Sequence, residues 1–455
     1  MTQDSAVPAE GIPTTINPLL TTPILGTLAR LSIPNVIAML ATALVAVAET
    51  AYAGQLGTSA LAGLALVFPM VMLQQMLSAG AMGGGISSSI SRALGAEDDA
   101  RAALLAVHAI VIGALAGIFF CVLFLLLGDG IYGVLGGYGI VLTEALAYSN
   151  IVFFGAIGVW MTNTLASIIR GGGDMKIPSI TLLVVAISQF LLAGTFGLGW
   201  GPFPALGMAG IAIGLVIAFS ASSLFLFWYL ISGRARVKLS LRSVRLQSEM
   251  FRDILKVGAI SCISPLQTVL TILILTRIVS EFGVEALAGY GIGARLEFLV
   301  VPIAFAIGVA CVPMVGMAIG AGNVARARQV AWTGGISAGL VIGLIGLVVA
   351  IFPDIWTGMF TDVPGVLRSA GLYFAWAGPF YGLLGLGLCL YFSSQGASKV
   401  LGPVIAGTIR LVIVALGGWL LATGSAPDWT IFALIGGAMA IYGAATALAV
   451  YLARW

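Results

Sequence analysis

Long apolar stretches follow one another along almost the whole chain, and short segments that carry the charges separate them. A membrane-spanning helix needs about 20 mainly apolar residues, and about twelve stretches reach that length. Strands of a membrane barrel alternate apolar and polar residues, whereas these stretches are continuously apolar, so the pattern predicts spanning helices. Their expected limits are 28–53, 60–90, 103–128, 143–169, 177–199, 205–231, 254–280, 286–317, 327–352, 367–394, 401–423 and 428–453.

Composition strengthens this prediction. Of the 455 residues, 60% are hydrophobic and only 8% are charged, and the mean hydropathy is +1.12. Water cannot solvate the folded surface of such a chain, so the lipid bilayer must be its solvent. The 61 glycines fit helices that pack closely within a bilayer. We therefore expect an all-α polytopic membrane protein.

The polar segments indicate the domain organisation. Residues 1–27 contain four prolines and lack a basic region before an apolar core, so we expect a mobile cytoplasmic tail rather than a cleaved signal peptide. The basic stretch from 232 to 256 is the longest polar interruption and divides the spans into two sets of six. We expect a first lobe at 28–231, an interlobe linker at 232–253 and a second lobe at 254–455.

Short sequence matches relate the two halves. Five residues recur 226 positions later, and further matches recur at spacings of 225 and 223. The matched sets are Gly57, Ala60, Leu61, Ala62 and Gly63 with Gly283, Ala286, Leu287, Ala288 and Gly289; Gly95, Ala100, Arg101 and Ala102 with Gly320, Ala325, Arg326 and Ala327; and Gly173 and Lys176 with Gly396 and Lys399. Three matches in order indicate an internal duplication. Since six is even, the repeats are parallel, and two pseudo-symmetric lobes that enclose a central cleft predict alternating access.

The distribution of basic residues predicts the orientation. When loops are assigned alternately to the two sides of the membrane, Lys and Arg concentrate on one side, together with the basic linker. Acidic residues dominate the other side. Cytoplasmic loops carry the excess of Lys and Arg, so both termini are expected in the cytoplasm, with the chain integral to the cell (inner) membrane.

Three segments resemble the multidrug and toxic compound extrusion (MATE) family. They are VAETAYAGQLGTSALAGLALVFP at 47–69, SRALGAEDDARA at 91–102 and IIRGGGDMKIP at 168–178. The resemblance covers nearly the whole chain and is closer to the DinF-like branch. It implies a V-shaped pair of six-helix lobes that exports cationic or amphipathic organic compounds in exchange for protons or Na⁺.

Glu49 is the first candidate site residue. Glu49 lies about five residues from the outer end of the first span. A carboxylate at this depth is unfavourable in a membrane unless it serves a function or has a partner. The resemblance implies an acidic cation-coupling residue here, and a carboxyl group in a low-dielectric cleft can exchange protons near neutral pH. A wetted residue at a helix end is the alternative. Pro34, on the same span, gives the helix a place to bend, and a static packing kink is its alternative.

Two amides complete the predicted coupling site. The resemblance places Asn163 and Gln189 near Glu49, where they could bond its protonated carboxyl group, although simple interhelical bonding is the alternative. Ala193 stands where the DinF-like branch often has a second carboxylate, and Leu215 stands where a hydroxyl is expected. Sodium needs several oxygen ligands whereas a proton needs one carboxylate, so we expect proton coupling.

Polar residues of the second half are candidates for the substrate cleft or for gating. They are Gln267, Arg295 and Glu297. Arg295 lies about nine residues, roughly 13 Å, from the outer end of its span, which places it near the membrane midplane. Arg295 and Glu297 are two residues apart on a helix and therefore point in different directions. A packed amide for Gln267 and a structural ion-pair role for the other two remain the alternatives.

Competing functions differ in their motifs. No HExxH or Walker sequence occurs, so we expect neither an enzyme nor an ATP-driven pump. A flippase for lipid-linked or amphipathic metabolites of the same superfamily is the alternative, although those proteins often have about fourteen spans. We expect small organic cations or amphipaths as substrates, H⁺ or Na⁺ as the coupling ion, no cofactor, no nucleic-acid partner and function as a monomer.

Overall fold

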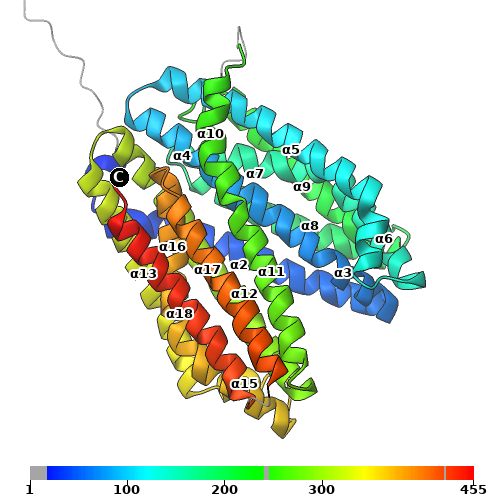
Figure 1. Ribbon diagram of the computed structural model, residues 1–455. Helices are drawn as coiled ribbons and strands as arrows, with labels where there is room; N and C mark the ends of the chain where they lie inside the picture. The colour runs from blue at the N-terminus through cyan, green and yellow to red at the C-terminus, as the bar shows by residue number, and fades with distance from the viewer. Residues whose placement is uncertain (1–17, 240–244, 425–426) are drawn as a thin grey trace, which may run out of the picture.

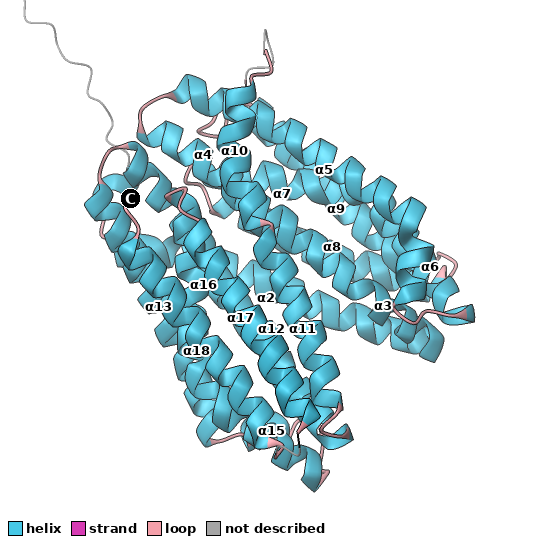
Figure 2. Cartoon of the chain, in the orientation of Figure 1, coloured by secondary structure: helices cyan, strands magenta, loops and turns pink. Residues whose placement is uncertain are grey.

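The computed structural model describes residues 18–239, 245–424 and 427–455, and within these ranges the chain forms helices without strands (Figures 1 and 2). Residues 1–17 of the predicted tail lie outside the described part. The rest of that predicted tail contains α1 (Pro18–Thr21) and the start of α2 at Ile24, four residues earlier than expected.

The first half of the chain supplies the first six spans. Its elements are α2 (Ile24–Leu56), α3 (Thr58–Gln75), a π-helical segment (Met76–Met82), α4 (Gly83–Gly95), α5 (Asp99–Val134), α6 (Gly139–Phe154), α7 (Ala156–Gly171), α8 (Lys176–Leu198) and α9 (Gly207–Ile231). A bend of 46° separates α6 from α7 at Gly155, and these two helices together make the fourth span.

The second half follows the same plan. Its elements are α10 (Ser248–Ser261), α11 (Ile263–Ser280), α12 (Val284–Gly320), α13 (Val324–Ile351), α14 (Asp354–Thr357), α15 (Pro364–Ala377), a 3₁₀ turn (Gly378–Phe380), α16 (Tyr381–Gly396), α17 (Leu401–Thr423) and α18 (Trp429–Leu452). α10 begins six residues before the predicted seventh span. Its first turns carry the charged residues Glu249, Arg252 and Asp253, so a search for apolar stretches missed the start of this helix.

The described residues contain eleven helices able to cross a membrane, or twelve when the bent pair α6 and α7 counts as one span. The prediction of about twelve spans is therefore confirmed, and the chain is an integral membrane protein. Large apolar side chains such as Leu115, Phe119 and Leu126 of α5 are exposed on the outside of the bundle, as lipid contact requires.

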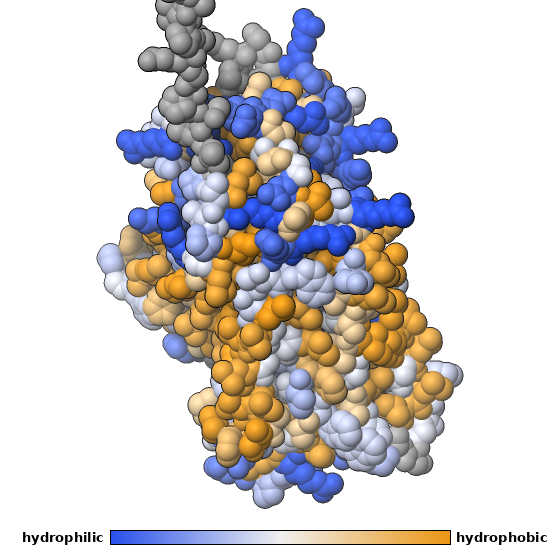
Figure 3. All heavy atoms as spheres, turned by 90° about the vertical axis from the view of Figure 1, so that its left-hand side faces the viewer, coloured by the Kyte–Doolittle hydropathy of each residue, from blue (hydrophilic) through white to orange (hydrophobic). Residues whose placement is uncertain are grey.

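The helices form two arms of a V (Figure 1). Helices α3 to α9 make one arm and α11 to α18 make the other, while α2 packs on both α8 and α12. The arms meet where α4 contacts α10, α12 and α16, which we name the closed end. They diverge toward the opposite end, which we name the open end and which holds α15 and the start of α3. Hydrophilic residues gather at the closed end, a smaller group lies at the opposite end, and apolar residues cover the middle (Figure 3).

Matching turns confirm that the two halves repeat. Asp98 caps α5 by accepting a bond from Arg101 N at 2.8 Å. Asn323, at the equivalent position of the second half, caps α13 by accepting a bond from Arg326 N at 3.0 Å. Each half also packs a glycine against an equivalent helix, α6 in the first half and α15 in the second. A Cβ atom on Gly63 would lie 2.8 Å from Ala145 N, and one on Gly289 would lie 2.6 Å from Ala370 N.

The same spans are interrupted in both halves. The fourth span breaks at Gly155, and the tenth span breaks at the Gly378–Phe380 turn, whose last residue is the repeat equivalent of Gly155. Interrupted helices leave backbone groups free to serve binding sites inside transporters.

Glycines bring the two arms together at the closed end. A Cβ atom on Gly85 of α4 would lie 2.7 Å from Gly258 N of α10, so these backbones touch. Gly95 of α4 lies against the backbone of Met317 in α12, and Gly316 of α12 lies against Ser91 of α4. We call this α4–α12 contact the seam. Without side chains at these positions the helices approach more closely than larger residues would allow.

The tight packing of the closed end can be tested by substitution. Gly85→Ala should lower the stability of the purified protein by about 1–3 kcal/mol, because the new methyl group meets backbone that cannot move aside easily. Gly130→Ala is the matched control, since a Cβ atom on this helical glycine of α5 would have nothing within 4 Å. It should leave the stability unchanged or raise it by up to about 1 kcal/mol. Equal unfolding midpoints for the two variants would contradict tight packing at Gly85.

Candidate functional site

Glu49 of α2 is buried, with 7% of its surface exposed, and neutral groups bond its carboxylate. Gln189 Nε2 of α8 donates to Oε1 at 2.8 Å, and the Tyr148 hydroxyl of α6 donates to Oε2 at 3.5 Å. No Lys or Arg of the described residues forms an ion pair with it. A buried carboxylate held by neutral donors remains free to bind a proton.

Aromatic side chains lie one turn beyond this carboxyl group. Tyr52 packs on Trp200 and Phe190, with ring centroids 5.4 Å and 5.7 Å away. Ala193 and Leu215 are both buried and supply no oxygen atom. Among the residues that the structure describes, no cluster of three or more metal-binding side chains exists.

Asn163 and Gln189 lie in different surroundings. Gln189 contacts Glu49, as the resemblance implied, whereas Asn163 Nδ2 donates to Gln75 Oε1 at 3.0 Å and to Ser78 Oγ at 2.8 Å. These partners lie at the end of α3 and in the π-helical segment that follows. Asn163 therefore joins α7 to the irregular part of the second span, and its predicted bond to Glu49 is absent in this conformation.

Pro34 lies inside α2, which continues through it as one helix. The next residue, Asn35, is completely buried, and its Nδ2 atom donates to Ala306 O of α12 at 3.4 Å. The helix that carries Glu49 is thus tied to the second arm beside its proline. A bend at Pro34 would move the Glu49 end of α2 relative to that tie.

Glu297 forms a second buried carboxyl site, in α12. It accepts a hydrogen bond from the Tyr373 hydroxyl, which lies 3.3 Å from the Tyr381 hydroxyl. Tyr373 is the repeat equivalent of Tyr148, the tyrosine that contacts Glu49. The two equivalent tyrosines therefore both bond a carboxyl group. The two carboxyl groups, however, come from spans one and eight, which are not equivalent in the repeat. Sequence patterns missed both tyrosines, although the repeat spacing relates them.

Arg295 does not share the Glu297 site. Its guanidinium carbon lies 5.2 Å from the centroid of the Phe360 ring, a cation–π contact with the connection between α13 and α15. In the same connection, Trp356 Nε1 donates to Ile292 O at 3.0 Å. Arg295 therefore contacts a loop of the open end, and its position near the membrane midplane stays a prediction.

Gln267 of α11 binds the neighbouring helix α17. Its Nε2 atom donates to Thr408 Oγ1 at 2.7 Å and to Val404 O at 3.3 Å. The side chain is 8% exposed and its Oε1 atom has no partner among the described residues. The amide thus bonds between helices in this conformation.

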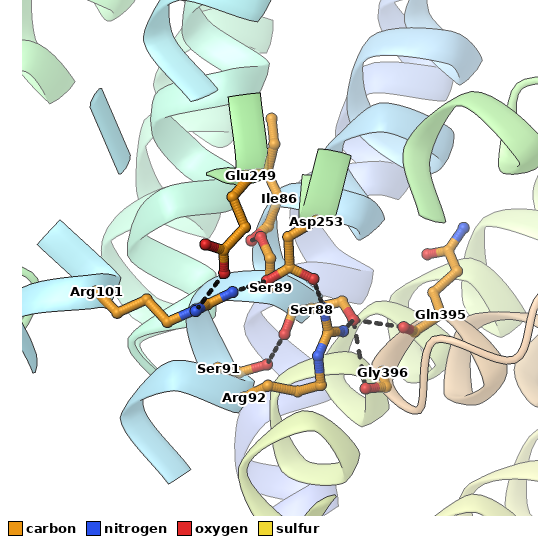
Figure 4. A network of polar contacts seen from close by, with 10 residues as sticks. All are labelled: Ile86, Ser88, Ser89, Ser91, Arg92, Arg101, Glu249, Asp253, Gln395 and Gly396. Carbon is orange, nitrogen blue, oxygen red and sulfur yellow. Dashed lines mark hydrogen bonds and ion pairs between the residues drawn. The ribbon is translucent and has the colours of Figure 1, made fainter. Parts of the chain in front are cut away.

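Ion pairs hold the closed end together (Figure 4). Arg92 of α4 contacts Asp253 of α10 at 2.8 Å, and Arg101 of α5 contacts the other oxygen of Asp253 at 3.3 Å. Arg92 also donates to Ser88 Oγ, which in turn donates to Gln395 O at the end of α16. Glu249 adds a 3.0 Å pair with Arg101. We call Arg92, Arg101, Glu249 and Asp253 the closed-end network.

Two duplicated six-helix halves, closed at one end and carrying buried carboxyl groups, define an integral membrane transporter. The chain belongs to the MatE family, whose model matches residues 34–195 and again residues 261–420. Members of this family are MATE transporters and not enzymes, and the double match agrees with the internal repeat.

Similar proteins cover nearly the same length. The FAD transporter of Shewanella oneidensis is 25% identical over 425 residues, which are 90% of each chain. The probable multidrug resistance protein NorM of Thermotoga maritima is 26% identical over 367 residues, 79% of this chain and 77% of that one. A solved structure of a MOP superfamily transporter from Pyrococcus furiosus shares the fold, with a TM-score of 0.88, 22% identity and coverage of 96% and 97%.

The closed-end network predicts the effect of removing its central acid. Asp253→Asn should abolish two ion pairs at once and leave Arg92 partly buried without a countercharge, which is costly. Spin labels on the exposed residues Glu97 and Lys399 would report the distance across the closed end. The variant should populate longer distances than the unsubstituted protein.

Glu249→Gln is the control for this substitution. The Glu249 side chain is 68% exposed, and exposed pairs contribute only about 0–1 kcal/mol. Its distance distribution should match that of the unsubstituted protein. If Asp253→Asn gave the same distribution as well, the network would not hold the closed end.

Proposed function

We propose that the chain exports cationic or amphipathic organic compounds and that protons returning through the Glu49 site drive the export. The observation that carries this proposal is the buried Glu49 carboxylate, which has only the neutral donors Gln189 and Tyr148. Membership of the MatE family and the multidrug resistance name of the Thermotoga relative support the export of organic compounds.

The partners of Glu49 suit a proton better than Na⁺. In the charged state both carboxylate oxygens accept bonds, and in the protonated state one oxygen becomes a donor. The Gln189 amide can serve both states, because rotation presents either its NH₂ group or its oxygen. Ala193 and Leu215 supply no further oxygen, so a sodium ion would have fewer oxygen ligands here than if these two positions carried a carboxylate and a hydroxyl.

The charge distribution supports an outward-open assignment for this conformation. Exposed basic residues surround the closed end, namely Lys176, Arg234, Arg236, Lys238, Arg245, Arg252 and Lys256. The open end carries the exposed acids Asp129, Glu281, Glu285, Asp354 and Asp428, with the exposed basic residues Arg277 and Arg368 beside them, whereas the closed end holds both signs with basic residues in excess. By the positive-inside rule the closed end and both termini face the cytoplasm, with the chain in the cell (inner) membrane.

This arrangement supports an alternating-access mechanism. α2 carries Glu49 and Pro34 and lies between the arms. A bend of α2 when Glu49 is protonated would therefore displace the contacts of α2 with both α8 and α12. The closed-end network would then part and admit substrate from the cytoplasm. Asn163, through the π-helical segment, and Gln267, Arg295 and Glu297 in the second arm are proposed to respond to this motion as gating or cleft residues.

A flippase or metabolite exporter is the second candidate function. The Shewanella relative is named as a transporter of FAD, which is an anionic amphipathic metabolite rather than a drug. The same lobes and coupling site would serve such a cargo. We propose that the chain is closer to the DinF-like branch of the family. We also propose that it acts as a monomer, because one chain contains both lobes.

Flux in proteoliposomes tests the coupling. A pH gradient should drive transport of a fluorescent organic cation by the unsubstituted protein, and Glu49→Gln should reduce it to background because the amide cannot bind and release a proton. Glu281→Gln is the control, since Glu281 is exposed at the open end and pairs with Arg277. It should retain full flux.

Two results would contradict the proposal. Transport driven by a Na⁺ gradient alone would exclude proton coupling. Full proton-driven flux in Glu49→Gln would show that the coupling site lies elsewhere. Glu297 would then be the next carboxyl group to substitute.

A further inference from the structure

Arg170, in the last turn of α7, is the largest fully buried side chain of the described chain, with 1% of its surface exposed. None of its Nε, Nη1 and Nη2 atoms has a hydrogen-bond partner among the described residues, and no described carboxylate pairs with it. Burying an arginine without a countercharge or bonds is strongly unfavourable. A guanidinium group stays protonated in proteins, so neutralisation of the side chain does not relieve this cost.

A small cavity lies against Arg170. Its volume is about 10 Å³, enough for one group about the size of a water molecule. Three helices enclose it: α4, α7 and α12, together with the π-helical segment. The lining residues are Ala79, Gly83, Gly84, Ser87, Ser167, Arg170, Val309 and Val312.

The polar lining offers donors. Ser87 Oγ is buried and has no partner among the described residues, so its hydroxyl hydrogen is available. Ser167 uses its hydroxyl hydrogen on Asn163 O at 2.7 Å. The guanidinium group brings five N–H donors and a full positive charge. A water molecule could accept some of these bonds but would leave the charge uncompensated, whereas an anion satisfies both.

We propose that Arg170 and Ser87 form a binding site for a small inorganic anion, with chloride as the physiological occupant. α4 and α7 of the first arm supply the donors, and Val309 and Val312 of α12 in the second arm cover the site. The site lies in the seam, so the anion enters when the arms separate there and is enclosed when they close. The site is independent of the proton coupling proposed at Glu49.

Glycines shape this cavity. A Cβ atom on Gly83 would lie 2.5 Å from Ser167 Oγ, and one on Gly84 would collide with the Gln395 side chain. Larger residues at these positions would fill the cavity that Arg170 lines. The limited volume excludes sulfate and organic acids in this conformation, and a chloride ion, which is somewhat larger than a water molecule, fits when the Arg170 and Ser87 side chains move slightly outward.

Unfolding of the purified full-length protein at constant Na⁺ concentration tests the site. When chloride replaces gluconate, the unfolding midpoint of the unsubstituted protein should rise and saturate, because a ligand of the folded state stabilises it. Arg170→Met should abolish the chloride dependence. Ser87→Ala should weaken the apparent affinity by roughly tenfold, the effect of losing one hydrogen bond to a charged partner.

Ser89→Ala is the matched control. Ser89 is buried on the same helix two residues away, but its Oγ atom donates to Ile86 O at 3.0 Å and does not line the cavity. Its chloride dependence should equal that of the unsubstituted protein. If Arg170→Met does not fold, Arg170→Lys, which retains the charge but loses the forked donors, should bind chloride more weakly.

Crystals grown in bromide give a direct measurement. An anomalous peak beside the Arg170 guanidinium group supports the site, and its absence at a halide concentration that saturates the midpoint overturns it. An unfolding midpoint that is the same in chloride and gluconate also overturns the proposal. Stabilisation only by an acidic organic substrate, and never by chloride, would identify Arg170 as a substrate contact instead and likewise overturn it.

Discussion

The hydrocarbon core of a bilayer offers no water to a buried polar group, and this constraint explains most of the arrangement around Glu49. The carboxylate must find donors on neighbouring helices, and α6 and α8 supply Tyr148 and Gln189. Both partners are neutral, so they satisfy the oxygen atoms without fixing the charge of the group. An arginine or lysine in their place would hold Glu49 permanently ionised and prevent the proton exchange that we propose for it.

A transporter also needs an end that closes reversibly, and the contacts of the closed end suit this requirement. Glycines such as Gly85 and Gly95 allow close backbone contact, while the closed-end network of Asp253 with two arginines lies partly in solvent. Apolar contact between helices contributes little in lipid, and partly exposed ion pairs are of modest strength. An interface that depends on glycine contacts and partly exposed ion pairs can form and separate without a large energetic cost, as the proposed rocking of the lobes requires.

The architecture could be predicted from the sequence because the signals involved are strong. The apolar stretches, the repeated sequence matches and the basic linker are recognisable without knowledge of any contact. Glu49 and Gln189 were also predicted as neighbours, through a family resemblance. The Tyr148 contact, the partners of Asn163 and the isolated burial of Arg170 were not predicted. They depend on helix rotation and on the breaks at Gly155 and Gly378, which apolar sequence leaves undetermined.

Infrared difference spectroscopy tests the central claim, that Glu49 is the carboxyl group that takes up and releases the transported proton. Membranes containing the protein would be titrated through the physiological pH range while the C=O stretch of protonated carboxyl groups is recorded. The account predicts a band that disappears as the pH rises, and that is absent from Glu49→Gln at every pH. A band of unchanged intensity in Glu49→Gln would show that another carboxyl group carries the proton and would contradict the account.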